Sequence, residues 1–156
     1  MRRKDREITE RKKIVEIMKR CDVCNVGFFG EEYPYIIPMN FGFDDSGDEL
    51  KLYFHSAKEG TKLELLKKNC KAAFSMNTSH KLIFDDLACS CTMEYESVCG
   101  NGTIRLLGNE EKTEALEYIM KQYQPEKTYV FNQKIVEMTT VMELKVEHIT
   151  GKQLKK

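Results

Sequence analysis

The sequence lacks an excess of charge of either sign, because its 156 residues include 25 lysines and arginines and 25 aspartates and glutamates. Balanced charge gives no global attraction to nucleic acid, an anionic membrane or an acidic substrate, and we expect neither nucleic acid nor a membrane as a partner. The chain also lacks an apolar run near the roughly 20 residues that span a bilayer. Its charged first seven residues lack the apolar stretch of a secretory signal. These absences predict a cytoplasmic protein.

The sequence motifs of the common hydrolases are absent as well. No serine–histidine–acid order, HExxH helix or paired-carboxylate signature occurs in the sequence. His80 and His148 have no partners at ligand spacing, so they are expected to be surface or supporting residues. A hydrolase is therefore unsupported.

Six cysteines are present, but a chain of this size with ample core residues does not need disulfides, so we expect reduced thiols. The pairs Cys21-x-x-Cys24 and Cys89-x-Cys91 have the composition of a four-thiolate zinc site. The alternative is that all four are small, half-buried residues. We favour the alternative and expect no metal, because the second pair lacks the usual spacer of two or more residues.

The length fits one domain with a single core, so residues 1–156 are treated as one domain. Apolar residues at helical spacing predict helices over Thr9–Cys21, over Lys62–Lys68 and from Asn109, as the cap, to Tyr123. Runs of β-branched and aromatic residues predict strands over Val23–Phe29, Tyr33–Phe43, Leu50–Phe54, Ala72–Met76, Cys91–Leu107 and Thr140–Ile149.

Two features of these strands favour a barrel. Pro34 and Pro38 indicate that the second strand is an edge or bulged strand, since proline cannot donate to a ladder. Gly100 and Gly102 interrupt a long strand and predict the sharp bend of a barrel corner. The fold class expected is α+β, a mainly antiparallel barrel with flanking helices.

The segment from Tyr53 to Lys62 is the most informative for function. A strand ends at His55, small residues follow, and a helix begins beyond Gly60 with unpaired amides and the positive end of its dipole. Ser56, His55 and Lys62 supply a hydroxyl, an imidazole and a point charge, which together suit a terminal phosphate. The alternative is an ordinary turn in which Ser56 caps the helix and Lys62 is solvated.

Two further stretches have weaker signals. Met39, Asn40 and Phe41 lie between a proline and a glycine, where backbone and amide groups can border a flat heterocycle. The alternative places Met39 and Phe41 in the core and Asn40 toward water. Ser97 offers a hydroxyl in the middle of a strand, although an exposed serine is the commoner fate.

The segments that carry these residues resemble the 5-nitroimidazole-resistance proteins of the pyridoxamine 5′-phosphate oxidase-like, FMN-binding split-barrel superfamily. The resemblance covers nearly the whole chain in order. It is most specific around His55 to Lys62, and its blocks are Pro34–Gly42, Leu52–Lys62, Tyr95–Val98, Glu110–Lys112 and Val146–Lys152.

The resemblance implies a homodimeric split barrel with two FMN molecules in clefts between the subunits. The residues implied to lie beside the flavin ring are Met39, Asn40 and Phe41. Those implied to meet the phosphate are His55, Ser56, Ala57 and Lys62, and a third strand approaches the cofactor with Ser97 and Val98. His55 is also implied as a candidate catalytic residue. Glu96 departs from the pattern, since many relatives carry arginine there, so a direct charge contact with the cofactor at this position is in doubt.

From these residues and the resemblance we expect an FMN-dependent reductase that passes electrons from a reduced nicotinamide donor to a small acceptor such as a nitro compound or quinone. Two alternatives remain open. One is a flavin- or nucleotide-binding module without turnover. The other is a haem-binding split barrel in which His55, His80 or His148 is the axial ligand.

Overall fold

The computed structural model describes residues 3–155. Its helices are the short 3-10 helices η1 (Lys4–Arg6) and η2 (Ala88–Ser90) and the α-helices α1 (Arg11–Arg20), α2 (Thr61–Lys68), α3 (Asn109–Tyr123) and α4 (Gln133–Met138). Its strands are β1 (Glu7–Ile8), β2 (Cys24–Phe28), β3 (Tyr35–Met39), β4 (Gly42–Asp44), β5 (Lys51–Ser56), β6 (Lys71–Ile83), β7 (Thr92–Leu106) and β8 (Thr140–Leu154).

Within residues 3–155, eight strands form one antiparallel sheet in the order β3-β2-β6-β7-β8-β5-β4, with β1 added beside β8. The edge strands β3 and β4 are consecutive in the chain and are separated only by Asn40 and Phe41. Two residues span a few ångströms, so the opposite edges of the sheet must lie close together. The sheet therefore curls into a barrel that is split between β3 and β4, which confirms the predicted α+β class.

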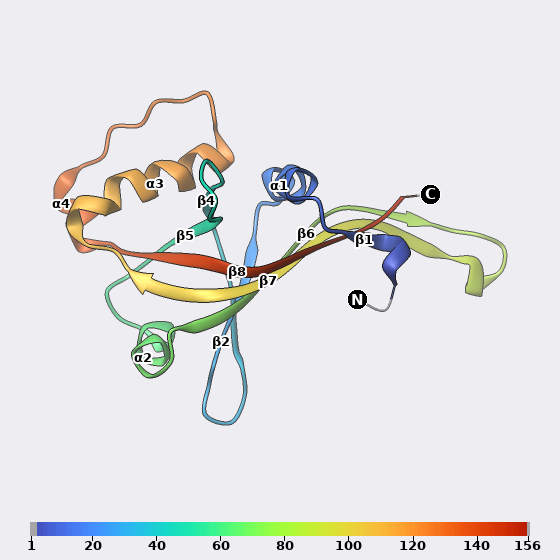
Figure 1. Cartoon of the computed structure of the whole chain (residues 1–156), viewed down its shortest axis with the longest axis horizontal. Helices are drawn as coiled ribbons and strands as arrows, with labels where there is room; N and C mark the ends of the chain where they lie inside the picture. Colours follow the sequence, from blue (N-terminus) through green and yellow to red (C-terminus); the bar gives the residue numbers. More distant parts are fainter. Residues whose placement is uncertain (1–2, 156) are drawn as a thin grey trace.

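The barrel interior is filled by alternate residues of the strands. In β2 the side chains alternate between buried and partly exposed, and the phenyl rings of Phe28, Phe41 and Phe54 lie in the core. Helix α1 adds its apolar stripe of Ile14, Ile17 and Met18 to this cluster. In Figure 1, α1 lies over the long strands, while α3 covers one end of the barrel and α2 lies on the opposite side.

Glycine sets the shape at two positions. The predicted bend in the long strand is confirmed, since the register of β7 with β8 shifts between Asn101 and Gly102. A side chain at Gly102 would meet the backbone of Lys145. Gly42 begins β4 directly against α3, where a side chain would meet the backbone of Tyr118 and Ile119. The close approach of α3 to the barrel therefore depends on Gly42.

Several predicted boundaries are wrong. The expected strand Tyr33–Phe43 is two strands, β3 and β4, because the chain crosses from one edge of the sheet to the other between them. The cap of α3 is Gly108 rather than Asn109, and the amide of Gly108 donates to Glu111 Oε2 at 3.1 Å. Strands β6 and β8 run beyond their predicted ends because β7 pairs with both over almost its full length. Helix α4 was not predicted.

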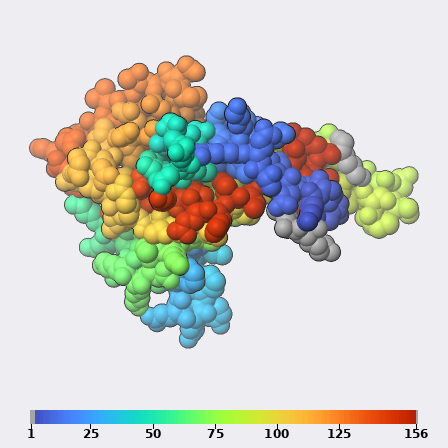
Figure 2. Space-filling model, viewed as in Figure 1, coloured from blue at the N-terminus to red at the C-terminus, as the bar shows by residue number. Residues whose placement is uncertain are grey.

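Two hairpins project from the body of the molecule. The β2–β3 hairpin and the β6–β7 hairpin point in different directions in Figure 1 and stand out in the space-filling view of Figure 2. Large apolar side chains are exposed on both, namely Phe29, Tyr33, Ile36, Leu82, Phe84 and Leu87. Within residues 3–155 no helix combines the length and apolarity needed to cross a membrane.

Candidate functional site

The turn between β5 and α2 has an open and uncapped helix start. Its N-cap is Gly60, whose φ of 134° is a conformation that glycine adopts without strain. Gly60 brings no side chain to the helix end, and a Cβ there would meet nothing within 4 Å. The amides of Leu63 and Glu64 donate to Gly60 O, at 3.0 and 3.3 Å. The amides of Thr61 and Lys62 come before the first of these bonds and have no acceptor within the helix.

Ser56 does not cap α2. Its hydroxyl donates to the carbonyl oxygen of Ala57 at 2.9 Å, and α2 has no side-chain cap. The alternative in which Ser56 caps the helix is therefore wrong. An anion at the helix start would compete for this hydroxyl proton, which is held by a neighbouring carbonyl in an exposed turn.

Electrostatics at this turn favour an anion. Partial desolvation and then the positive charge of Lys62 lower the pKa of His55, which favours the neutral imidazole. Lys62 is half-buried and lies close enough for its charge to act on His55. The turn thus brings together a lysine charge, a neutral imidazole, a hydroxyl and the positive end of a helix. This donor set fits a phosphate group.

The segment Met39–Phe41 closes the barrel and is mostly core. Met39 is 8% exposed and Phe41 0% exposed, whereas Asn40 is exposed. Asn40 does not simply face water, because its Nδ2 donates to the hydroxyl of Tyr123 at 3.0 Å. Asn40 therefore presents a side chain to a ligand, whereas Met39 and Phe41 are buried and the Phe41 amide donates to the Tyr123 hydroxyl at 3.1 Å.

The third group of predicted residues lies on β7. Val98 is fully buried in the barrel core, and Ser97 points to the outer face of the sheet, where it is partly exposed. Ser97 pairs with Lys152 on β8, whereas His55 pairs with Val141 on the same strand. Eleven residues of β8 separate these positions, about 35 Å of strand at about 3.3 Å per residue. Within one chain, Ser97 and the β5–α2 turn do not meet.

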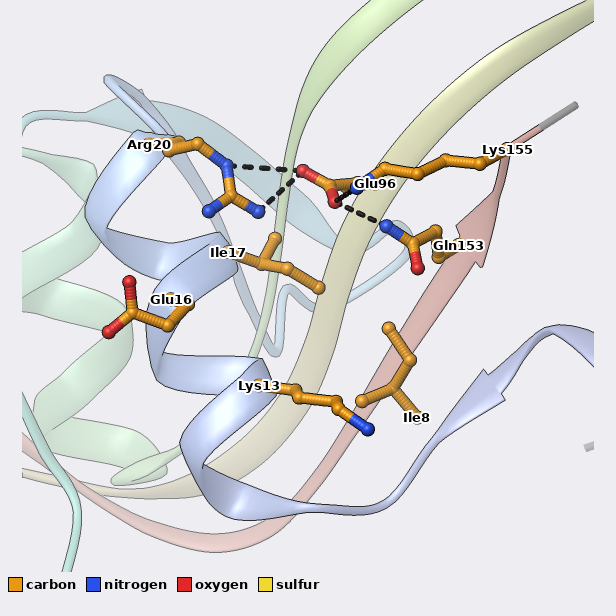
Figure 3. Close-up of a pocket in the computed structure, with 8 residues that line it drawn as sticks. All are labelled: Ile8, Lys13, Glu16, Ile17, Arg20, Glu96, Gln153 and Lys155. Carbon is orange, nitrogen blue, oxygen red and sulfur yellow. Dashed lines mark hydrogen bonds and ion pairs between the residues drawn. The ribbon is translucent and has the colours of Figure 1, made fainter.

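Glu96, next to Ser97, is buried at 2% exposure and is held by side chains from three elements. Figure 3 shows its carboxylate between Arg20 of α1 and the end of β8, where Gln153 Nε2 and Lys155 Nζ contact it at 2.5 and 3.1 Å. Arg20 Nη2 lies 2.6 Å away, and the Ser79 hydroxyl 2.9 Å.

Ser79 lies at the irregularity of β6 and has a φ of 58°. Burial alone would raise the pKa of Glu96, but hydrogen bonds from Arg20, Lys155 and Ser79 outweigh burial and lower it to about 2. The carboxylate is therefore fully engaged within its own chain. It fastens α1, β6 and the end of β8 to β7.

The two cysteine pairs do not come together. Cys21 and Cys24 are buried beneath α1, while Cys89 is exposed and Cys91 partly exposed on the β6–β7 hairpin. Within the described part of the chain, no group of three or more histidine, cysteine, aspartate or glutamate side chains is arranged to hold a metal ion.

The sequence of the chain matches the family model described as pyridoxamine 5′-phosphate oxidase over residues 10–153. The match runs from the start of α1 almost to the end of β8, so it includes every strand of the barrel except β1. The chain belongs to the pyridoxamine 5′-phosphate oxidase family. The family predicted from the sequence is thereby confirmed.

Solved structures agree with membership of the pyridoxamine 5′-phosphate oxidase family. A candidate 5-nitroimidazole antibiotic resistance protein from Bacteroides thetaiotaomicron is 32% identical, with 94% of this chain and 86% of that chain covered and a TM-score of 0.82. A flavocytochrome from Azotobacter vinelandii is 19% identical, with 100% and 72% covered and a TM-score of 0.82.

An FAD- and heme-binding protein from Mycobacterium smegmatis is 17% identical, with 97% and 74% covered and a TM-score of 0.83. At these lower identities the last two show the shared fold alone. None of the curated proteins matches this chain in sequence.

The structural roles of two residues of this pyridoxamine 5′-phosphate oxidase family member, Tyr123 and Glu96, were not predicted from the sequence. Tyr123 was predicted only as the end of a helix, and Glu96 only as a departure from the pattern of relatives. Their partners lie 83 and 76 positions away in the chain, at Asn40 and Arg20. Periodicity within an element carries no signal of such contacts.

Proposed function

We propose that this chain binds FMN and uses it as a reductase, passing electrons from a reduced nicotinamide donor to a nitro compound or quinone. The observation that carries the proposal is the β5–α2 turn, with an uncapped helix start at Gly60 and a lysine, Lys62, as the second residue of the helix. One helix start with one lysine matches a terminal monophosphate, which FMN has and FAD lacks.

The named relatives support flavin as the class of ligand. The relative with 32% identity is named for nitroimidazole resistance, and two structures with the same fold are named for a flavin-bearing cytochrome and for binding FAD and heme. A bound flavin would supply the two-electron chemistry that no side chain provides. The residues of this chain then have two tasks, to hold the phosphate and to orient the ring.

We assign these tasks to groups of the β5–α2 turn and of the segment between β3 and β4. Lys62, the α2 amides and the Ser56 hydroxyl would hold the phosphate. The exposed amide of Asn40 and the backbone beside it would border the ring. Partial desolvation and Lys62 lower the pKa of His55, which favours a neutral imidazole that would both donate and accept a hydrogen bond near the bound group.

A homodimer is part of the proposal, because the residues expected to contact FMN lie in two separate places on a single chain. Ser97 and the β5–α2 turn are about 35 Å apart along β8, farther than one FMN can reach. A second copy that places its β7 beside this turn would complete a site between the subunits.

The outer face of the central strands supports such a contact. Cross-strand pairing puts nine small, uncharged residues at the centre of this face, with Lys152 and His148 beside them on β8, although 32% of the chain is charged. They are Asn25, Gly27, Ala73, Ser75, Asn77, Ser97, Cys99, Asn101 and Thr150. Charge depletion at the centre of a patch is typical of an interface between proteins.

The area available also fits a dimer. Four strands about 4.8 Å apart and three rows of residues cover about 400 Å² of this face. A stable interface needs about 800 Å² per partner. The β2–β3 hairpin borders the face with an apolar pocket of about 370 Å³ lined by Phe29, Tyr33 and Ile36. The rings of Phe29 and Tyr33, which are 59% and 79% exposed, would add to the area buried in the dimer.

The visible absorption spectrum of the purified protein, followed by heat release of the bound group, tests the proposal. Twin flavin bands with FMN in the supernatant, and NADH or NADPH oxidation that depends on a nitro compound or quinone, are the expected results. FMN binding without turnover would leave a binding module, and a Soret band would indicate haem. Light scattering should give twice the 18.2 kDa chain mass. The reducing cytoplasm, in which all six unpaired thiols would persist, is the proposed location.

A further inference from the structure

The hydroxyl of Tyr123, the last residue of α3, lies where the barrel closes. It accepts hydrogen bonds from Asn40 Nδ2 at 3.0 Å and from the Phe41 amide at 3.1 Å, and it donates to Asp22 O at 2.8 Å. A phenol has one proton and two accepting positions, so all three are used. The Phe41 amide lies between two edge strands, and the hydroxyl takes the place of a ladder partner.

This bonding pattern fixes the orientation of the Asn40 amide. The proton of Tyr123 is committed to Asp22, so the group that Asn40 turns toward the hydroxyl must be a donor. Nδ2 therefore faces Tyr123, and Oδ1 faces away from it, on a residue that is exposed to solvent. Asn40 thus offers an accepting oxygen outward, instead of rotating freely between its two hydrogen-bonding faces.

The position of Tyr123 is itself rigid. The preceding residue, Gln122, donates through Nε2 to Met18 O at 3.0 Å and to Cys21 O at 2.8 Å, which ties the end of α3 to the end of α1. The middle of α3 rests on Gly42, the residue that follows Phe41. The hydroxyl is therefore anchored on both sides of the Asn40–Phe41 bridge.

We propose that Tyr123 is a positioning residue that aims the Asn40 amide, so that Asn40 Oδ1 selects a ring carrying an N–H donor. This inference rests on the proposed function, in which the ring lies beside Asn40. Oxidised isoalloxazine carries a single ring N–H, at N3. The probe that follows is FMN methylated at N3, which keeps the phosphate and the ring but removes that donor.

The experiment measures the Kd of FMN and of N3-methyl-FMN for five proteins by flavin fluorescence. They are the unmodified chain, Tyr123→Phe, Asn40→Ala, the double variant of these two, and the control Tyr129→Phe. Tyr129 lies on the loop after α3, where its hydroxyl bonds Gln124 Oε1 at 3.2 Å. The unmodified chain and Tyr129→Phe should bind FMN about five- to tenfold more tightly than the methylated probe, the range of one hydrogen bond.

In Tyr123→Phe and Asn40→Ala this preference should fall to less than twofold. A preference that persists in either variant would overturn the inference, because it would then come from steric exclusion or another residue. When Tyr123→Phe is added to Asn40→Ala, the preference for FMN over the methylated probe should not change further. If Tyr123 had a purely structural role, this second substitution would lower the affinity for FMN again. Wild-type protein that binds neither flavin would instead refute the proposed function. Amide exchange of Phe41, faster in Tyr123→Phe than in Tyr129→Phe, confirms the hydrogen bond independently of flavin.

Discussion

Replacement of Glu96 by glutamine tests the buried carboxylate network most directly. Glutamine keeps the shape of the side chain and removes its charge. Arg20 and Lys155 would then face a neutral amide in place of a carboxylate. We expect a loss of folding free energy, because charge-assisted hydrogen bonds become neutral ones and an N–H group is turned toward cations.

The magnitude follows from proton linkage. The pKa of Glu96 falls from its ordinary value of 4.5 to about 2 in the folded chain. At about 1.4 kcal/mol per pKa unit, this corresponds to a ceiling of about 3 kcal/mol at pH 7. The side chains of Arg20 and Lys155 are 45% and 66% exposed, so solvent screens one side of the network. A loss of about 2 kcal/mol is therefore expected.

The pH dependence gives the sign of the effect. Because the folded pKa is depressed, the stabilisation is complete above pH 4.5 and disappears as the pH falls toward 2. At pH 3 less than half of it should remain, so the difference between Glu96→Gln and the unmodified chain should shrink to about 1 kcal/mol or less.

Urea unfolding at pH 7 and pH 3 measures both quantities. The matched control is Glu117→Gln on α3, whose carboxylate is 44% exposed and lies 3.8 Å from Lys121. It should cost less than about 0.5 kcal/mol. A Glu96→Gln protein as stable as the unmodified chain at pH 7, or equally destabilised at both pH values, would refute the reasoning.

Three further predictions follow from the same structure. Gly42→Ala should lower the free energy of unfolding by about 2 kcal/mol or more, and with it Tm, because the methyl group would meet the backbone of α3. Gly47→Ala is the control and should be nearly neutral, since a Cβ there meets nothing within 4 Å. Lys62→Ala should weaken FMN binding by about 1.5–3 kcal/mol, while the control Lys67→Ala, at the far end of α2, should not weaken it. If fluorescence titration gives the two variants equal affinity for FMN, Lys62 is not part of the site. A thiol reagent should modify the exposed cysteines of the native protein within minutes and the buried pair only on unfolding, because burial raises the pKa of Cys21 to about 11 and also raises that of Cys24. The exposed group is Cys70 and Cys89, and the buried pair is Cys21 and Cys24. Cys99 is left out of this comparison because it lies on the face that the proposed dimer would cover.

The local pattern of the sequence determined most of the helices and strands. It also determined the part of the candidate site whose residues are adjacent in the sequence. The apolar spacing of α1, the edge position of β3 marked by its prolines, and the glycine bend in β7 each depend on a few adjacent residues. The turn from His55 to Lys62 is equally local, since a strand end, a glycine and a helix start follow one another within eight residues.

Only the tertiary structure decided the features that depend on closure of the barrel, namely where one predicted strand divides and which distant side chains form hydrogen bonds. The residues of Tyr33–Phe43 look like one strand because β-branched and aromatic residues continue throughout, yet the sheet splits them at Asn40 and Phe41 to join its two edges. Tyr123 and Glu96 acquire their roles from partners more than 70 residues away. Propensity and periodicity describe how a segment meets its own neighbours. Which distant donor reaches a buried acceptor is settled only when the sheet curls and brings the two together.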